Sequence, residues 1–234
     1  NKFLIVTSMK PISEINFQLD DLRSRTKNCL FANIQNPDEE HISVYLKTSW
    51  EKLAAEIKLA QPNKHPRLEM MLSTVKKADI STSKYPPSIE SVFKRVEKKD
   101  EPFRVNPIVD VFTGITCELG ASFGAYDVDR IDGQINLRFS KGNEEFLPIN
   151  STTTELTNEN EIVYADDQNV LERNFVWKQA NKGKINQNTS SIIFFCELFT
   201  DMGVAAVDEA KVTIVKRLKT LLNATEVETE TISN

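Results

Sequence analysis

Two carboxylates that lie close together in the chain, Asp127 and Asp129, are the first candidates for chemistry. They belong to a compact polar loop predicted over 121–129, and Arg130 follows directly. Carboxylates in such a loop can contact a bound substrate, or they can cap the turn and pair with the arginine. Both interpretations stay open, and Asp127 is the candidate catalytic residue of the loop.

A third carboxylate, Glu197, stands inside the apolar run 191–199. A carboxylate buried there without a partner is costly, so the sequence predicts a partner such as Arg173 or Lys178. A structural ion pair and a role in a binding pocket fit the sequence about equally well. Glu197 is therefore the second candidate catalytic residue.

Trp177 stands among polar and cationic residues: Arg173, Asn174, Lys178 and Gln179. A tryptophan that only filled the core would not call for this much polarity, whereas an aromatic ring beside cations suits stacking on a terminal nucleotide. Two basic clusters could either contact an RNA backbone or form ordinary solvated faces. They are Lys94, Arg95, Lys98 and Lys99, and Lys178, Lys182 and Lys184.

The residue types for nucleophilic or metal-dependent chemistry do not occur in a suitable pattern. His41 and His65 are the only histidines, so the sequence offers no Ser-His-Asp or Cys-His constellation and no zinc-ligand spacing. The seven glycines are scattered and form no phosphate-binding loop. Cys29, Cys117 and Cys196 are far apart beside apolar residues, which predicts reduced core thiols. We expect no metal and no cofactor.

The composition is that of an ordinary globular protein, with 40% hydrophobic and 27% charged residues among 234. A formal net charge of −5 argues against non-specific binding of nucleic acid, but it permits binding of an RNA by one local basic patch. No stretch has the apolar length of a membrane span, and the N-terminus lacks the pattern of a signal peptide. We expect a cytoplasmic protein, and its oligomeric state stays open.

The segment 106–139 contains the elements that must position the polar loop. Asn106-Pro107 is typical of a helix start, apolar residues recur with helical spacing up to Leu119, and Gly120 suits a left-handed cap. Beyond the loop, Asp132-Gly133 predicts a turn. The alternating residues Ile135, Leu137 and Phe139 then predict a half-buried strand.

The rest of the chain predicts an α+β fold. Strands are expected at 3–6, 29–34, 161–165, 170–177 and 191–199, and helices at 48–57 (after a Thr48/Glu51 capping box), 66–75, 88–96 and 207–221. The helices and strands segregate, which favours a central mixed or antiparallel sheet with helices packed on it. We expect one domain over 1–222, with 1–84 as an N-terminal α/β extension, and a disordered acidic tail over 223–234.

Several longer motifs follow one another over roughly 85–199. They are YPPSIES at 85–91, NPIVDV at 106–111, GAYDVDRIDG at 124–133, LRF at 137–139, IVYADD at 162–167 and NFVWKQ at 174–179. Together they resemble the B3/4 domain, the editing module of the phenylalanyl-tRNA synthetase β subunit, and more closely the free-standing proteins built on that module. The resemblance implies the fold of that module and a tRNA-binding esterase that hydrolyses mischarged aminoacyl-tRNA in trans.

Hydrolysis of an aminoacyl ester, which is already activated, makes modest demands on a protein. It requires an oriented water, N–H donors for the oxyanion, and a carboxylate or carbonyl near the substrate ammonium, but no dedicated nucleophile. The catalytic candidates are Asp127 and Glu197. The resemblance implies substrate contacts at Phe112, Thr113, Gly124, Tyr126, Arg173, Asn174, Trp177 and Gln179. The RNA-binding candidates are Lys94, Arg95, Lys178, Lys182 and Lys184.

The chain departs from the synthetase pattern at several of these positions. Gly124 replaces a histidine of the synthetase loop, Phe112-Thr113 replaces Thr-Asn, and the Gly-Gly segment falls near Asn174-Phe175. The glutamate that reads a tyrosine hydroxyl falls on Phe195, so we expect a cargo other than tyrosine.

The missing histidine favours a second hypothesis, a module that binds an amino acid or a tRNA end without hydrolysis. A third hypothesis, an interaction scaffold, requires an exposed apolar patch.

Overall fold

The computed structural model describes residues 2–6, 32–34, 37–60, 65–199, 204–225, 227 and 229–233. In chain order the elements are β1 (Lys2–Val6), β2 (Ala32–Asn33), α2 (Glu39–Ala60), α3 (Pro66–Lys77), α4 (Ser88–Lys98), α5 (Pro107–Leu119), β3 (Ser122–Asp127), the 3-10 turn η4 (Val128–Arg130), β4 (Asn136–Lys141), β5 (Glu145–Phe146), β6 (Glu155–Leu156), β7 (Glu159–Ala165), β8 (Val170–Arg173), β9 (Lys178–Gln179), β10 (Ser191–Phe199), α6 (Val204–Leu221) and β11 (Glu230–Ser233). The predicted α+β class is confirmed.

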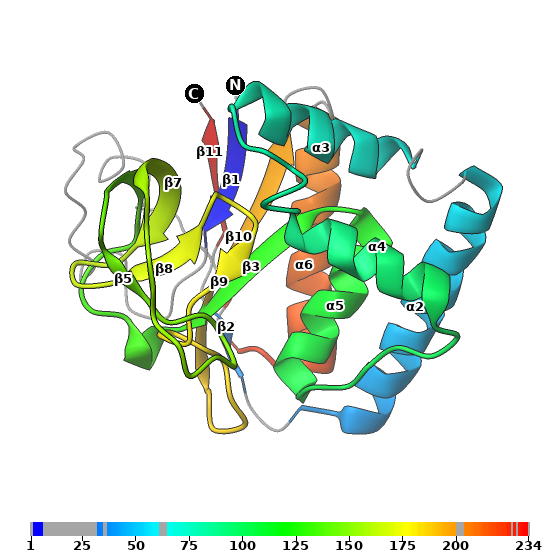
Figure 1. Cartoon of the computed structure of the whole chain (residues 1–234). Helices are drawn as coiled ribbons and strands as arrows, with labels where there is room; N and C mark the ends of the chain where they lie inside the picture. Colours follow the sequence, from blue (N-terminus) through cyan, green and yellow to red (C-terminus); the bar gives the residue numbers. More distant parts are fainter. Residues whose placement is uncertain are drawn as a thin grey trace.

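The strands form two main antiparallel sheets. The first sheet has the order β11-β1-β10-β2, with β3 also paired to β10, and the second has the order β4-β7-β8-β9. β5 and β6 pair separately. Figure 1 shows helices α5 and α6 on one side of the first sheet and the second sheet on the other. The central strand β10 is thus covered on both faces.

This two-sided burial explains the continuous apolar run of β10. Ile192, Phe194, Cys196 and Leu198 belong to a core that includes residues of α5 and α6. Ile193 and Phe195, which point to the opposite face, belong to the core that also contains Tyr164 of β7. Successive side chains of a strand alternate between faces, so Glu197 shares the face of Phe195. The predicted strand 191–199 is confirmed.

Helix α5 has the predicted start and end. The side chain of Asn106 accepts a hydrogen bond from the Val109 N–H at 3.0 Å, and Pro107 occupies the first turn. Gly120 ends the helix in the left-handed conformation with φ 58°, and its N–H donates to the Thr116 carbonyl. The helix therefore delivers the chain directly to β3.

Three local predictions were wrong. Helix α2 begins at Glu39, capped by Asp38, which accepts from the His41 N–H at 3.0 Å, so Thr48 lies within the helix and caps nothing. Residues 122–127 form a strand because they pair with β10, although they look like a polar loop in isolation. The strand predicted over 170–177 ends at Arg173, because Asn174 adopts the left-handed backbone conformation.

The helices predicted at 66–75 and 88–96 are α3 and α4, and the last predicted helix is α6. Within strand β4, Phe139 is exposed rather than half-buried. Of the predicted strand 29–34, residues 32–33 form β2, whereas Cys29 lies outside the described residues. No helix in the described part of the chain is long and apolar enough to cross a membrane.

The two ends of the chain meet in the first sheet. β1 pairs with both β10 and β11, and Phe3 stands opposite Ser233 (Figure 1). Ala224 is buried and Val227 packs against the helix-side core. The prediction of a disordered tail is therefore wrong for these residues, because main-chain pairing to a strand requires no apolar side chains.

We expect deletion of residues 228–234 to lower the melting temperature, since β1 then loses its antiparallel partner. A chain of this size shifts by about 2–4 °C per kcal/mol, so a loss of roughly 1–2 kcal/mol is measurable by calorimetry. Deletion of Asn234 alone is the control. An unchanged melting temperature for the longer deletion would show that β11 adds no stability.

Candidate functional site

The two main sheets exchange a pair of hydrogen bonds where they meet. Tyr126 of β3 donates its hydroxyl to Glu172 Oε2 of β8 at 2.9 Å. Tyr164 of β7 donates its hydroxyl to Glu197 Oε1 of β10, also at 2.9 Å. Tyr164 and Glu172 stand directly opposite each other in the second sheet. Each sheet therefore supplies one tyrosine to the carboxyl group of the other, and we call these four residues the Tyr–Glu cluster.

The Tyr–Glu cluster is almost completely sealed. Tyr126, Tyr164, Glu172 and Glu197 are 0%, 1%, 7% and 3% exposed. The ring of Phe195 lies 4.9 Å from that of Tyr164 and 5.8 Å from that of Tyr126, and the Phe175 ring lies 6.3 Å from that of Tyr164. The tyrosines that hold the two carboxyl groups are thus packed against the Phe195 and Phe175 rings.

Burial controls the protonation of the cluster. It raises the pKa of Glu197 to about 7, although the hydrogen bond from Tyr164 opposes this. Burial, with the nearby negative charge of Glu197, raises the pKa of Glu172 well above its ordinary value. Burial also raises the pKa of both tyrosines, so their hydroxyls remain donors. We infer that the two carboxyl groups retain at least one proton between them at neutral pH.

The absence of a side chain at Gly124 leaves room for the carboxyl group of Glu172. Gly124 stands opposite Phe195 in the sheet, and a Cβ atom built on it would lie 3.0 Å from Glu172 Oε2. That distance is tighter than ordinary packing, so a larger residue here would push the carboxyl group away. The position at which the synthetase pattern has a histidine is therefore bordered by a carboxyl group in this protein.

Two buried polar atoms in this region have no hydrogen-bond partner within the described part of the chain. They are Glu197 Oε2 and Asn174 Nδ2. A buried polar atom left unpaired costs about 1–3 kcal/mol. Asn174 is 5% exposed. Such atoms are candidates for contact with a ligand.

Asn174 and Phe175 both adopt the left-handed conformation, with φ 50° and 68°. For residues other than glycine this costs on the order of 1–2 kcal/mol each, less for asparagine. The synthetase pattern has Gly-Gly near these positions, and glycine adopts this conformation without strain. Residues 174–177 thus form a sharp turn without glycine, which we call the Trp177 turn.

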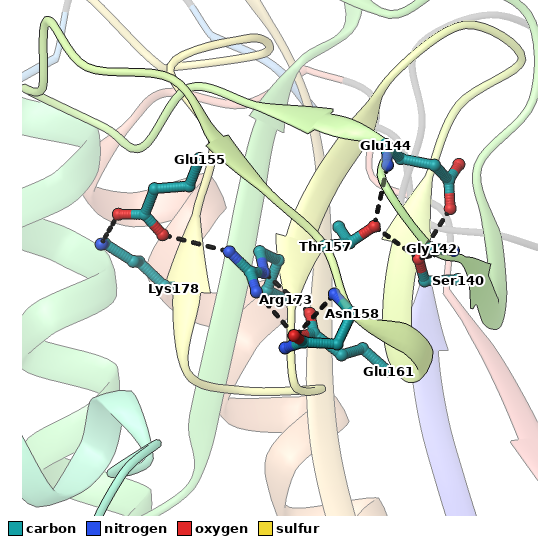
Figure 2. A network of polar contacts seen from close by, with 9 residues as sticks. All are labelled: Ser140, Gly142, Glu144, Glu155, Thr157, Asn158, Glu161, Arg173 and Lys178. Atoms are coloured by element: carbon teal, nitrogen blue, oxygen red, sulfur yellow. Dashed lines mark hydrogen bonds and ion pairs between the residues drawn. The ribbon is translucent and has the colours of Figure 1, made fainter.

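Arg173 points away from the Tyr–Glu cluster and belongs to an ion network (Figure 2). Its Nε and Nη2 atoms donate to Glu161 at 2.7 and 2.6 Å, and its Nη1 donates to Glu155 at 3.1 Å. Lys178 Nζ donates to Glu155 at 2.7 Å. Burial alone would raise the pKa of Glu161, but the hydrogen bonds from Arg173 and Asn158 outweigh it and lower the pKa.

The expectation that Glu197 pairs with Arg173 or Lys178 was therefore wrong. Arg173 and Lys178 stand opposite each other on β8 and β9, one residue along from Glu172 and Gln179. The strand period of two places the cations and Glu172 on opposite faces of the second sheet. Gln179 lies on the inner side, where its Nε2 donates to the Ala125 carbonyl of the first sheet at 2.8 Å.

Trp177 is half-buried at the edge of the second sheet. Its ring meets the Tyr85 ring edge to face at 4.7 Å, and Lys178 Nζ and the Arg173 guanidinium lie 5.1 and 5.7 Å from it. The adjacent Val176 carbonyl accepts the N–H of Ser88, whose hydroxyl in turn meets that of Ser122 at 2.9 Å. Ser122 stands opposite Glu197. The start of α4 thus links the Trp177 turn to the first sheet.

Other predicted residues lie elsewhere. Phe112 packs on Phe194 with ring centres 5.1 Å apart, on the helix side of β10, and the Thr113 hydroxyl donates to the Val109 carbonyl. Phe112 and Trp177, both expected to contact the substrate, are therefore separated by strand β10.

The described contacts of Asp127 fit the interpretation in which it caps a turn. Its carboxylate accepts from Thr189 Oγ1 at 2.7 Å, the Asp129 N–H at 3.1 Å and Asn186 Nδ2 at 3.4 Å, with Arg130 Nε 3.9 Å away. Asp129 itself is exposed. These contacts cap η4 and hold the 186–189 turn.

The basic candidates are spread over the surface. Lys94 pairs with Glu90, Lys182 with Asp132, and Lys184 donates to Asn150. The Arg95 guanidinium lies 4.4 Å from the centre of the Phe103 ring. Arg95 thus contacts the segment that follows α4. Only the other end of the helix, at Ser88, is hydrogen-bonded to the Trp177 turn among the described residues.

Sequence reasoning missed Tyr164, Glu172 and Glu161. Glu172 carries the same signal as Glu197, a carboxylate inside an apolar strand, and Tyr164 lies within the IVYADD motif. Among the residues that the structure describes, no group of three or more His, Cys, Asp or Glu side chains could hold a metal ion.

The fold and this site can now be compared with known proteins. The B3/4 domain matches residues 74–213, more than half of the sequence, and the chain therefore belongs to the B3/4 domain family. The matched region includes the whole Tyr–Glu cluster and the Trp177 turn.

Its curated relatives include phenylalanine–tRNA ligase β subunits. That of Photorhabdus laumondii is 27% identical over 101 residues, and that of Pectobacterium atrosepticum is 28% identical over 100. Each match covers 43% of this chain and only 12% of the relative. A solved N-terminal fragment of the Pyrococcus horikoshii phenylalanyl-tRNA synthetase β subunit shares 13% identity, with a TM-score of 0.38 over 47% of this chain and 40% of that one.

We expect the Tyr–Glu cluster to make stability fall as pH rises. Unfolded glutamate has a pKa near 4.3, whereas burial raises the folded pKa of Glu197 to about 7 and that of Glu172 well above its ordinary value. Folding therefore takes up protons in this window, and stability that is present below pH 4 is lost as pH rises through 7. The slope approaches about 1.4 kcal/mol per pH unit for one proton.

Denaturant unfolding at several pH values measures this slope. Glu197→Gln should flatten it while preserving an acceptor for Tyr164, and Glu209→Gln on the exposed face of α6 is the control. Equal slopes in the wild type and in Glu197→Gln would contradict the raised pKa.

We expect Arg173→Met to destabilise the fold by about 3–5 kcal/mol, because it leaves the buried carboxylate of Glu161 unpaired. Lys178→Ala, at a partly exposed pair, should cost less than about 1 kcal/mol. Adding Glu161→Gln to the Arg173 variant should recover part of the loss. A folded Arg173→Met protein of full stability would argue against the structural role.

Proposed function

We propose that this domain binds the aminoacylated 3′ end of a tRNA and hydrolyses the ester of mischarged aminoacyl-tRNA in trans, in the cytoplasm. The observation that carries the proposal is made in and beside the Tyr–Glu cluster: this member of the B3/4 family has buried polar atoms, at Glu197 and Asn174, without a partner among the described residues. Unpaired atoms of this kind are costly in a purely structural core and are satisfied when a polar ligand arrives.

In this proposal the residues divide the work between the two ends of the substrate. Glu197 receives the ammonium group of the amino acid at its Oε2 atom, which has no hydrogen-bond partner among the described residues. Trp177 receives the terminal base, and Lys178 beside it faces the phosphate backbone. The ester lies between them, and a bound water attacks it, so no protein nucleophile is required.

The cargo we propose is an amino acid other than tyrosine. Phe195 stands where the synthetase pattern has the glutamate that reads a phenol. Its ring is packed by Tyr126 and Tyr164, whose own hydroxyls are engaged by carboxyl groups. The Phe195 ring therefore offers a phenolic cargo no hydrogen bond at the position where the synthetase pattern has a glutamate.

One observation favours a second candidate function, binding without hydrolysis. Gly124 carries no side chain that could act on the ester, and Glu172 borders its position. A module of this kind would bind an amino acid or an aminoacylated tRNA end and leave the ester intact.

A panel of radiolabelled aminoacyl-tRNAs separates the two functions. Loss of the label from one or a few mischarged species, at a rate proportional to protein, supports hydrolysis. Tight binding with a stable ester supports the second function. Neither binding nor turnover of any member of the panel would refute both.

We expect Trp177→Ala to weaken binding of aminoacyl-tRNA by about 1–3 kcal/mol, or roughly 5- to 150-fold in Kd, with little change in the unfolding midpoint. Lys178→Ala should also flatten the salt dependence of binding, as expected for one lost phosphate contact. Phe139→Ala, which removes an exposed aromatic ring from the edge strand β4, is the matched control. A Trp177→Ala protein that melts early yet binds and deacylates normally when cold would show that Trp177 is only structural.

A further inference from the structure

The free oxygen of Glu197 defines the kind of ligand that the Tyr–Glu cluster can accept. Oε1 already accepts the Tyr164 hydroxyl, whereas Oε2 is buried without a partner in the described part of the chain. The residue is 3% exposed, so this atom gains little from bulk water. A ligand that donates one hydrogen bond to it removes a cost of about 1–3 kcal/mol.

The described groups around Glu197 are acidic or neutral. Tyr164 faces it from β7, Glu172 from β8 and Tyr126 from β3, and its negative charge raises the pKa of all three. On its own strand, the Cys196 thiol has its pKa raised, mainly by burial and also by this charge. The cations of the adjoining strands, Arg173 and Lys178, are held by Glu161 and Glu155. The cluster therefore repels anions and lacks a resident cation.

The geometry also selects among cationic ligands. A guanidinium group prefers two parallel hydrogen bonds to both oxygens of a carboxylate, but one oxygen of Glu197 is already engaged. A divalent metal requires several ligands, and the described residues contain no group of three or more that could hold one. A primary ammonium donates single hydrogen bonds from a compact nitrogen, which suits one free carboxylate oxygen beside phenol oxygens.

We propose that Glu197 Oε2 binds the primary ammonium group of the ligand, and that Glu172 keeps its proton while Glu197 releases its own to solvent as the ligand enters. No bond of the ligand is formed or broken in this step: the ammonium N–H donates to the carboxylate that the departing proton leaves behind. The inference rests on the proposed function, in which this ammonium is the α-amino group of the cargo.

Proton release makes the affinity depend on pH in a defined way. Burial raises the pKa of Glu197 to about 7, so below this pH the ligand must displace a proton. The Kd then falls about tenfold for each pH unit gained, and it levels off above pH 7, where Glu197 is already ionised. The proton on Glu172 does not enter this balance, because the negative charge that forms on Glu197 raises the pKa of Glu172 and holds that proton in place.

Simple amines test this without an ester. Isobutylamine and phenethylamine remain protonated up to pH 8, and their N-acetyl forms are the matched neutral controls. Calorimetric titration at pH 5.5, 6.5 and 7.5, in two buffers with different ionisation heats, measures both Kd and the number of protons released. We expect binding of at least one amine, about one proton released at pH 5.5, a tenfold gain in affinity by pH 6.5, and at least tenfold weaker binding of its acetyl form.

Glu197→Gln should lose at least tenfold in affinity together with the pH dependence, while Glu209→Gln on α6 behaves like the wild type. Retained near-ultraviolet circular dichroism would show that the Glu197 variant is folded. Equal binding of the acetyl forms, a Kd that does not change with pH, or no binding of either amine overturns the inference.

The two proposals fail separately. Amine binding with proton release but without turnover of any aminoacyl-tRNA removes the hydrolytic function and leaves the ammonium site. Turnover that is unaffected by Glu197→Gln removes the ammonium site and leaves the hydrolytic function.

Discussion

The exchange of tyrosine hydroxyls between the two sheets is the constraint on which the rest of the structure depends. Burying two carboxyl groups between sheets costs free energy unless hydrogen-bond donors reach them. Tyr126 and Tyr164 provide one donor each, from opposite sheets. This arrangement requires the second sheet to cover the face of β10 that bears Glu197. It also requires a residue without a side chain at Gly124, where a Cβ atom would crowd Glu172.

Strand alternation then separates the charges of the second sheet. Glu172 points inward to the Tyr–Glu cluster, whereas Arg173, one residue later, points outward into an ion network with Glu161 and Glu155 (Figure 2). Because the arginine is neutralised on the outer face, the inner face stays acidic and uncompensated. An inner site of this character suits a cationic group of a ligand. On the outer face, Arg173 and Lys178 contact the Trp177 ring while both are paired with glutamates.

The turn between these two regions is held in an unfavourable conformation. Asn174 and Phe175 are both left-handed, and the Asn174 amide is buried with an unpaired nitrogen. Such strain persists only where the surrounding structure imposes it, here through the Phe175 N–H bond to the Ile162 carbonyl and the Ser88 bond to the Val176 carbonyl. The strain and the unpaired amide nitrogen therefore lower the stability of the fold locally at this turn.

The sequence by itself determined the elements whose signals are local: α5 with its Asn106 cap and Gly120 stop, the buried strand β10, the α+β class and the family motifs. Only the tertiary structure decided that 122–127 is a strand, that Phe112 lies behind β10, and that Glu197 pairs with Tyr164 rather than Arg173. Caps and periodicity act within a few residues, whereas Tyr164 and Glu197 are 33 residues apart. Which strands lie side by side decides such pairs, and no local pattern encodes that choice.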